Sequence, residues 1–102
     1  MNKIKVLIKR PGEPPRSVWI NDTLENLQRT VGGYIEIVTL QRGLVVICDE
    51  EGRLKGKPHN CTVRGVEFVG DIVIAGQEGE ELADYPTDFR TIKAAYPELW
   101  EA

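Results

Sequence analysis

Residues 21–40, NDTLENLQRTVGGYIEIVTL, constrain the fold most, because they predict a helix start, a helix stop and a strand in close succession. Asp22 followed three residues later by Glu25 is typical of a capping box at a helix N-terminus. Apolar residues then recur at the spacing of one helical face, which we expect to be buried. These residues are Leu24, Leu27 and Val31.

Gly32 and Gly33 mark the end of this helix, since glycine adopts the left-handed conformation of a helix C-cap at no steric cost. Residues 34–40 are rich in β-branched side chains and predict a strand. Before the helix, residues 4–9 alternate apolar side chains with lysines, and residues 17–20 form a second short apolar run. The two runs are joined by a proline-rich connector and predict a β-hairpin.

Further strands are expected in the second half of the chain. Residues 44–48 and 71–75 are almost continuously apolar, as central strands covered on both faces are. Residues 53–57 are expected to return as a short strand. Residues 58–70 show no clear period and are expected to be irregular.

A second helix is expected near the C-terminus, with Thr87 or Asp88 as its cap. Pro97 ends it, because the residue before a proline is disfavoured in a helix. Leu99 and Trp100 follow and are expected to form a hydrophobic latch on the body of the protein. The predicted buried face of this helix carries Phe89, Ile92 and Tyr96.

The predicted order is β-β-α-β-β…β-α, with about five strands in a single mixed or antiparallel sheet and two helices. Runs of strands with segregated helices indicate an α+β fold. The opening hairpin, helix and strand are similar to a grasp-like arrangement. A chain of 102 residues without an internal repeat or linker is expected to form one domain over residues 1–102.

Several classes of protein are disfavoured by what the chain lacks. No apolar run approaches the roughly 20 residues that cross a bilayer, and no signal peptide is recognisable, so we expect a cytoplasmic protein without membrane contact. Cys48, Cys61 and His59 are too few for a structural zinc site, and no disulfide is expected. No phosphate-binding loop is present, and we expect neither a cofactor nor a metal.

Charge is divided unevenly along the chain. Residues 1–64 carry a net charge of +4, whereas residues 65–102 carry −7. An acidic tail of this size competes with nucleic acid for any basic patch, which argues against DNA or RNA as a partner. The acidic run at residues 49–51 is typical of a solvated turn.

Three motifs together resemble a known family. They are TLExLQxxVGGYIE over residues 23–36, EEGRLxGxPxN over residues 50–60, and GDIVxxG over residues 70–76. The chain is similar to a small domain family of unknown function that is spread through phages, plasmids and conjugative elements of Gram-positive bacteria. The resemblance covers roughly residues 3–90. It implies an accessory role in a mobile element, with a host or element-encoded protein as partner, and no established activity.

The candidate binding residues lie in residues 53–60, where basic side chains alternate with other residue types. If this segment is extended, these side chains project to one side and form a site for a small anionic ligand. Asn60 adds hydrogen-bonding groups, and Tyr34 or Trp19 would wall a pocket. The alternative is a solvated edge strand whose lysines prevent sheet pairing. The basic residues are Arg53, Lys55, Lys57 and His59.

Three functions remain open at this point. The absence of a recognisable catalytic motif favours a non-enzymatic binding module for a partner protein or a small anionic ligand. A small metal-free hydrolase would use His59 with a carboxylate, and a Cys–His nucleophile pair would need Cys48 or Cys61 with His59 as its base. An interaction protein would form homo-oligomers through a sheet edge or through Trp100.

Overall fold

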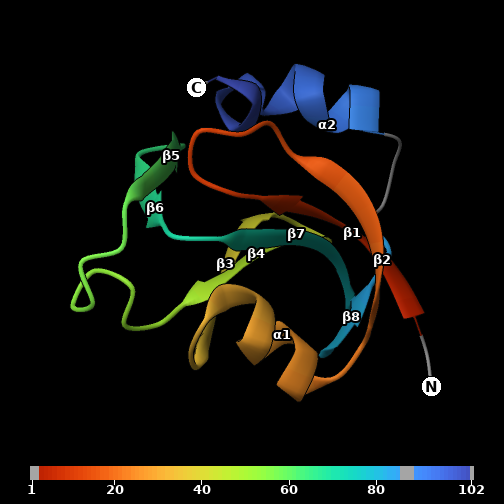
Figure 1. The fold of residues 1–102 in the computed structure, drawn as a ribbon. Helices are drawn as coiled ribbons and strands as arrows, with labels where there is room; N and C mark the ends of the chain where they lie inside the picture. Colours follow the sequence, from red (N-terminus) through yellow and green to blue (C-terminus); the bar gives the residue numbers. More distant parts are fainter. Residues whose placement is uncertain (1–2, 86–88, 102) are drawn as a thin grey trace.

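The computed structural model describes residues 3–85 and 89–101, which form a six-stranded sheet, a two-stranded sheet and helices on both faces of the larger sheet (Figure 1). Every described strand pairing is antiparallel. The elements in chain order are β1 (Lys3–Lys9), β2 (Arg16–Asn21), α1 (Leu24–Val31), β3 (Ile35–Gln41), β4 (Leu44–Asp49), β5 (His59–Val63), β6 (Val66–Val69), β7 (Ile72–Glu78), β8 (Glu81–Ala83), α2 (Phe89–Ala95) and the 3₁₀ helix η1 (Pro97–Trp100).

The main sheet has the order β2-β1-β7-β4-β3, and β8 adds to β7. This arrangement confirms the predicted α+β fold, and of the two expected sheet types, mixed or antiparallel, the described pairings show the antiparallel one. The expected single sheet of about five strands is instead a six-stranded sheet with a separate two-stranded sheet. β4 and β7 lie at the centre and are almost fully buried, as their continuous apolar runs predict. β2 and β3 lie at the two edges of the ordered sheet.

The prediction that residues 58–70 are irregular was wrong, because this segment contains the β5–β6 hairpin. Arg64 and Gly65 form its two-residue turn, and both have positive φ, at 50° and 80°. Such turns normally carry asparagine, aspartate or glycine at the first of these positions. Because Arg64 occupies this position, the sequence does not show the usual signal of a two-residue hairpin turn.

The two faces of the main sheet carry separate apolar cores. α1 packs on one face, and α2, η1 and the β5–β6 hairpin cover the other (Figure 1). Leu27 and Val31 of α1 are buried, as predicted, but Leu24 is 57 % exposed. Leu24 is the first residue of α1, so the buried face of this helix begins at Leu27, about one turn later than the spacing of the apolar residues predicts.

The ends of α1 only partly follow the sequence prediction. The N-cap is Thr23, whose side-chain oxygen accepts a hydrogen bond from the Asn26 amide at 3.2 Å, so the expected Asp22 cap was wrong by one residue. At the other end Gly32 adopts the left-handed conformation, with φ of 86°, and confirms the predicted C-cap.

In the C-terminal segment, Ile92, Tyr96 and Leu99 are buried in the core on the α2 face, and Trp100 packs against it. The expected hydrophobic latch is thereby confirmed. The predicted caps Thr87 and Asp88, and the side chain of Phe89, lie outside what the structure describes. No helix in the described ranges is long and apolar enough to cross a membrane.

Candidate functional site

The segment that carries the predicted basic row is not extended. Residues 50–56 form successive turns, so the expected strand over residues 53–57 was wrong. Its backbone is closed by hydrogen bonds from the Lys55 amide to the Glu51 carbonyl and from the Lys57 amide to the Gly52 carbonyl, both 3.0 Å. Gly56 supports these turns with a φ of 70°.

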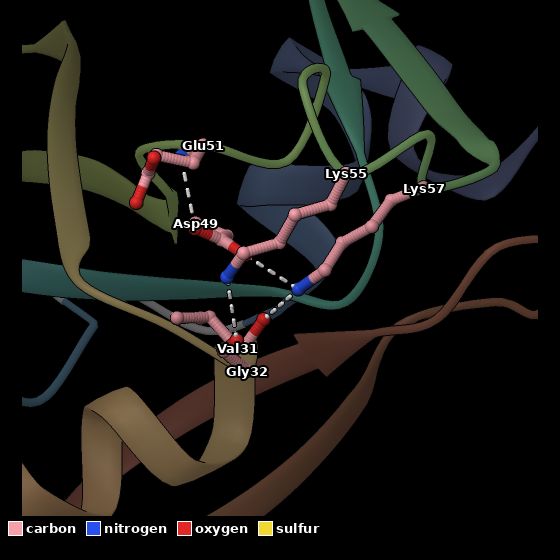
Figure 2. A network of polar contacts seen from close by, with 6 residues as sticks. All are labelled: Val31, Gly32, Asp49, Glu51, Lys55 and Lys57. Atoms are coloured by element: carbon pink, nitrogen blue, oxygen red, sulfur yellow. Dashed lines mark hydrogen bonds and ion pairs between the residues drawn. The ribbon is translucent and has the colours of Figure 1, made fainter.

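Asp49, the last residue of β4, forms ion pairs with two of the predicted ligand residues, Lys55 and Lys57. Its side chain is 1 % exposed, and it accepts Lys57 Nζ at 2.7 Å and Lys55 Nζ at 2.9 Å (Figure 2). The Glu51 amide donates to the same carboxylate at 2.9 Å. The expectation that the acidic run at residues 49–51 is a solvated turn was therefore wrong for Asp49, which is buried and fully engaged.

The same two lysines bind the end of α1 (Figure 2). Lys57 Nζ donates to the Val31 carbonyl at 2.6 Å, and Lys55 Nζ donates to the Gly32 carbonyl at 3.1 Å. The last carbonyls of a helix lack intrahelical donors and lie at the negative end of its dipole, so ammonium groups stabilise them. Together with Asp49, these contacts form a clamp, which we call the Asp49 clamp, between residues 50–58 and α1.

The Gly-Gly pair that ends α1 makes room for the Asp49 clamp. A Cβ at Gly33 would lie 2.6 Å from Asp49 Oδ1, and a Cβ at Gly32 would lie 2.8 Å from Lys57 Nζ. Real Cβ atoms almost never approach so closely, so the neighbouring group would have to move. The flexible end of Lys57 can move away from Gly32 at little cost, whereas the buried Asp49 carboxylate beside Gly33 cannot, so Gly33 serves the approach of the charged groups and Gly32 the helix end.

The two lysines of the Asp49 clamp favour the ionised form of the Asp49 carboxyl group. Burial by itself raises the pKa of Asp49, but hydrogen bonds from Lys57, Lys55 and the Glu51 amide outweigh burial and lower the pKa to about 2. The two ammonium groups are in turn held by a carboxylate and by helix carbonyls. Neither lysine is thus presented to solvent as an unpaired charge.

Arg53 and His59 converge on a different acid, Glu67 of β6. His59 Nδ1 lies 2.8 Å from Glu67 Oε2. Arg53 donates to the Glu67 carbonyl at 3.1 Å and lies 3.9 Å from its carboxylate. The four basic residues of the predicted row therefore split into two groups, each built around an acidic side chain. Their role as an anion site stays a prediction, without the common face that motivated it.

The remaining predicted site residues lie apart. Asn60 is buried, and its Nδ2 donates to the carbonyls of Lys9 and Gly70 at 2.9 and 2.7 Å, so its amide group joins β5 to the end of β1. Tyr34 is 68 % exposed beside the start of β3, and Trp19 lies on β2 at the opposite edge of the sheet. Tyr34 and Trp19 therefore lie too far apart to line one pocket together, and neither lines the groove described below.

The structure instead forms a groove between β3–β4 and β6, which sequence reasoning missed. Its volume is about 290 Å³. The floor is apolar, and the rim carries acidic side chains and one arginine, Arg53. The buried or half-buried lining residues are Val38, Cys48, Asp49, Phe68 and Val69, and the exposed rim residues are Glu36, Glu50, Arg53, Leu54, Val66 and Glu67.

Charge in this groove is predominantly negative. Asp49 is neutralised in its clamp, and Glu67 is shared by Arg53 and His59. Among the described residues, Glu36 and Glu50 form no ion pair. The exposed rim thus carries two carboxylates without a counter-ion among the described residues. Its residues come from four separate segments, and no local spacing in the sequence brings them together.

The thiols are poorly suited to nucleophilic chemistry. Burial, together with the carboxylates of Glu36 and Asp49, raises the pKa of Cys48 to about 11, and burial also raises the pKa of Cys61. Cys61 is buried, whereas the side chain of His59 is 57 % exposed. The described residues contain no group of three His, Cys, Asp or Glu side chains placed to hold a metal ion.

Comparison with known proteins gives one match. A family model described as a domain of unknown function, DUF3846, matches residues 4–100. No curated protein and no solved structure matches the chain. The match agrees with the expected resemblance to a family of unknown function and supplies no activity.

Proposed function

Because the chain belongs to the DUF3846 family, whose function is unknown, its role has to follow from its own surface, and we propose that it is a non-enzymatic module that binds a partner protein. The partner places a basic segment in the groove between β3–β4 and β6. In keeping with the family resemblance, the module acts in the cytoplasm as an accessory protein of a phage or mobile element.

The single observation that carries this proposal is the composition of the groove: an apolar floor beneath a rim where Glu36 and Glu50 form no ion pair among the described residues. An aliphatic basic side chain matches both parts, because its stem packs on apolar atoms while its head stays near carboxylates. The volume of about 290 Å³ suits one or two side chains. It lies at the lower limit of the range for pockets that enclose small-molecule ligands.

A small anionic ligand has less support than a basic protein segment. Lys55 and Lys57 are engaged by Asp49, and Arg53 and His59 by Glu67. A hollow of about 320 Å³ does lie beside Arg29 and Lys57. It adjoins the C-terminal end of α1, whose dipole repels anions.

The hydrolase alternative has one supporting observation, the 2.8 Å hydrogen bond between His59 and Glu67. His59 does not line the groove, however, and its exposed imidazole is not shielded from water. General acid–base catalysis needs the base within reach of a bound substrate, so this pair lacks a place to hold one.

The test is selection of short peptides from a random display library on the wild-type protein. We expect enrichment of peptides that combine lysine or arginine with apolar residues. The variant Glu36→Lys/Glu50→Lys reverses the unpaired charges of the rim and should weaken the selected peptides at least about tenfold, since like charges would then meet.

A matched control is Glu13→Lys/Glu25→Lys, which changes the net charge equally at two exposed positions outside the groove. It should bind the selected peptides within about twofold of wild type. Enrichment of acidic peptides, or equal loss in both double variants, would contradict the proposed function.

A further inference from the structure

The wall of the groove contains an edge of the main sheet. β3 is paired with β4, and it has no second neighbour among the described strands. Its sequence, IEIVTLQ, contains no proline or lysine and one charged residue, Glu36. Exposed edge strands usually carry such residues to prevent pairing with another chain. In β3 such protection is limited to Glu36 and to a bulge between Thr39 and Gln41 at the end of the strand.

The hydrogen-bond pattern defines which backbone groups of β3 are free for pairing. The Glu50 amide donates to the Tyr34 carbonyl at 2.8 Å, and the next pair in register is Ile35 with Asp49. In an antiparallel ladder, hydrogen-bonded and non-hydrogen-bonded pairs alternate. Glu36 and Val38 therefore bond to β4, whereas the backbone groups of three residues point away from it. These residues are Ile35, Ile37 and Thr39.

Side chains along the same edge alternate between two environments. Glu36 and Val38 line the groove, and Ile37, which is 43 % exposed, points to the face of the sheet that α1 covers. A strand added beside β3 at the usual spacing of about 4.8 Å would place every second side chain next to Glu36 and Val38. Its other side chains would lie beside Ile37.

The acidic side chains beside β3 favour a basic strand over an acidic one at this edge. If two copies of this chain paired β3 with β3, each acidic groove rim would approach the other, and like charges across a strand pair are destabilising. A segment with basic residues at alternate positions avoids this repulsion and neutralises Glu36. Apolar residues at the intervening positions would cover Ile37.

We propose that the partner segment binds as an added β-strand on β3, with basic side chains at alternate positions over the groove and apolar side chains beside Ile37. This inference rests on the proposed function and specifies how the partner is held. Main-chain hydrogen bonds to Ile35, Ile37 and Thr39 supply the affinity, and Glu36 with the groove supplies the selection for a basic sequence.

The test uses a short synthetic peptide of alternating lysine and valine, titrated into the protein by fluorescence anisotropy. Ile37→Pro removes an outward amide without touching the β3–β4 ladder, which edge strands tolerate. It should weaken binding at least about tenfold. Ile37→Thr keeps the amide and the β-branch, and should bind within about threefold of wild type.

Two N-methylated peptides make the test independent of the variants' folding. One carries N-methyl groups on all lysines, the other on all valines. Strand addition uses one set of peptide amides, because amides alternate in direction along a strand. One N-methylated peptide should therefore lose binding at least about tenfold, and the other should retain it.

The outcomes separate the two proposals. If Glu36→Lys/Glu50→Lys weakens binding while Ile37→Pro and both N-methylated peptides bind as well as their parents, strand addition is overturned and the proposed function stands. If wild type binds neither this peptide nor any peptide selected from the library, both are overturned.

Discussion

The Asp49 clamp makes a quantitative prediction about stability. The substitution Asp49→Asn keeps the shape of the side chain and removes its charge, so Lys55 and Lys57 lose their counter-ion. The pKa of Asp49 falls from 3.8 to about 2 in the folded protein. At 1.36 kcal/mol per pKa unit, this shift corresponds to about 2–3 kcal/mol of folding free energy, and the carboxyl is buried, so solvent screening is small.

The sign of the pH dependence follows from the lowered pKa. The folded protein binds the proton of Asp49 less readily than the unfolded chain, so the contribution is complete above pH 4 and is lost as pH falls from about 4 to 2. Asp49→Asn should lower the free energy of unfolding by about 2–3 kcal/mol at pH 7. The difference from wild type should approach zero near pH 2.

The assay is urea denaturation of wild type and Asp49→Asn at a series of pH values between 2 and 7. A matched control is Asp71→Asn, because Asp71 forms a 3.9 Å pair with Arg10 at the exposed surface. Surface pairs of this kind contribute less than about 1 kcal/mol. A difference for Asp49→Asn that is below 0.5 kcal/mol at pH 7, or that does not change with pH, would refute the account of the clamp.

Three further predictions follow from the same structure. Gly33→Ala should lower the free energy of unfolding by about 1–3 kcal/mol, because its Cβ would lie 2.6 Å from Asp49 Oδ1; an unchanged urea midpoint would contradict this close approach. Lys9→Met should raise stability by about 1–3 kcal/mol, because Lys9 Nζ is fully buried without a hydrogen-bond partner among the described residues; a loss of stability would point to a partner elsewhere. Cys48 should react with a disulfide reagent far more slowly at pH 8 in the native protein than in urea, since a pKa of about 11 leaves roughly one thiolate in a thousand; equal rates would contradict its burial.

The parts of the fold that sequence predicted correctly depend on local signals. Gly32 ends α1 because a left-handed C-cap needs glycine, and this requirement is independent of the rest of the chain. The apolar runs of β4 and β7 identify central strands for a similar reason. The prediction of a strand over residues 53–57 was wrong because it rested on the alternation of basic residues. Gly56 and Pro58, which lie within or next to this segment, are typical of turns.

The candidate site could not be predicted from sequence because long-range contacts determine it. Lys57 contacts the Val31 carbonyl, 26 residues earlier in the chain, and no pattern around either residue indicates this contact. The acidic groove combines β3 and β4 with β6 and Arg53 in the same way. Sequence reasoning located the charged residues, but it could not tell that Lys55 and Lys57 are held by Asp49 while Glu36 forms no ion pair within residues 3–85 and 89–101.

The central claim is that Lys55 and Lys57 are held by Asp49, that Arg53 and His59 are held by Glu67, and that the protein offers an acidic groove to its partner. The most direct measurement is calorimetric titration of the wild-type protein with two peptides, one alternating lysine with valine and the other alternating glutamate with valine. We expect heat of binding from the lysine peptide and none from the glutamate peptide. Binding of the glutamate peptide, with loss of that binding in Lys55→Glu/Lys57→Glu, would contradict the claim.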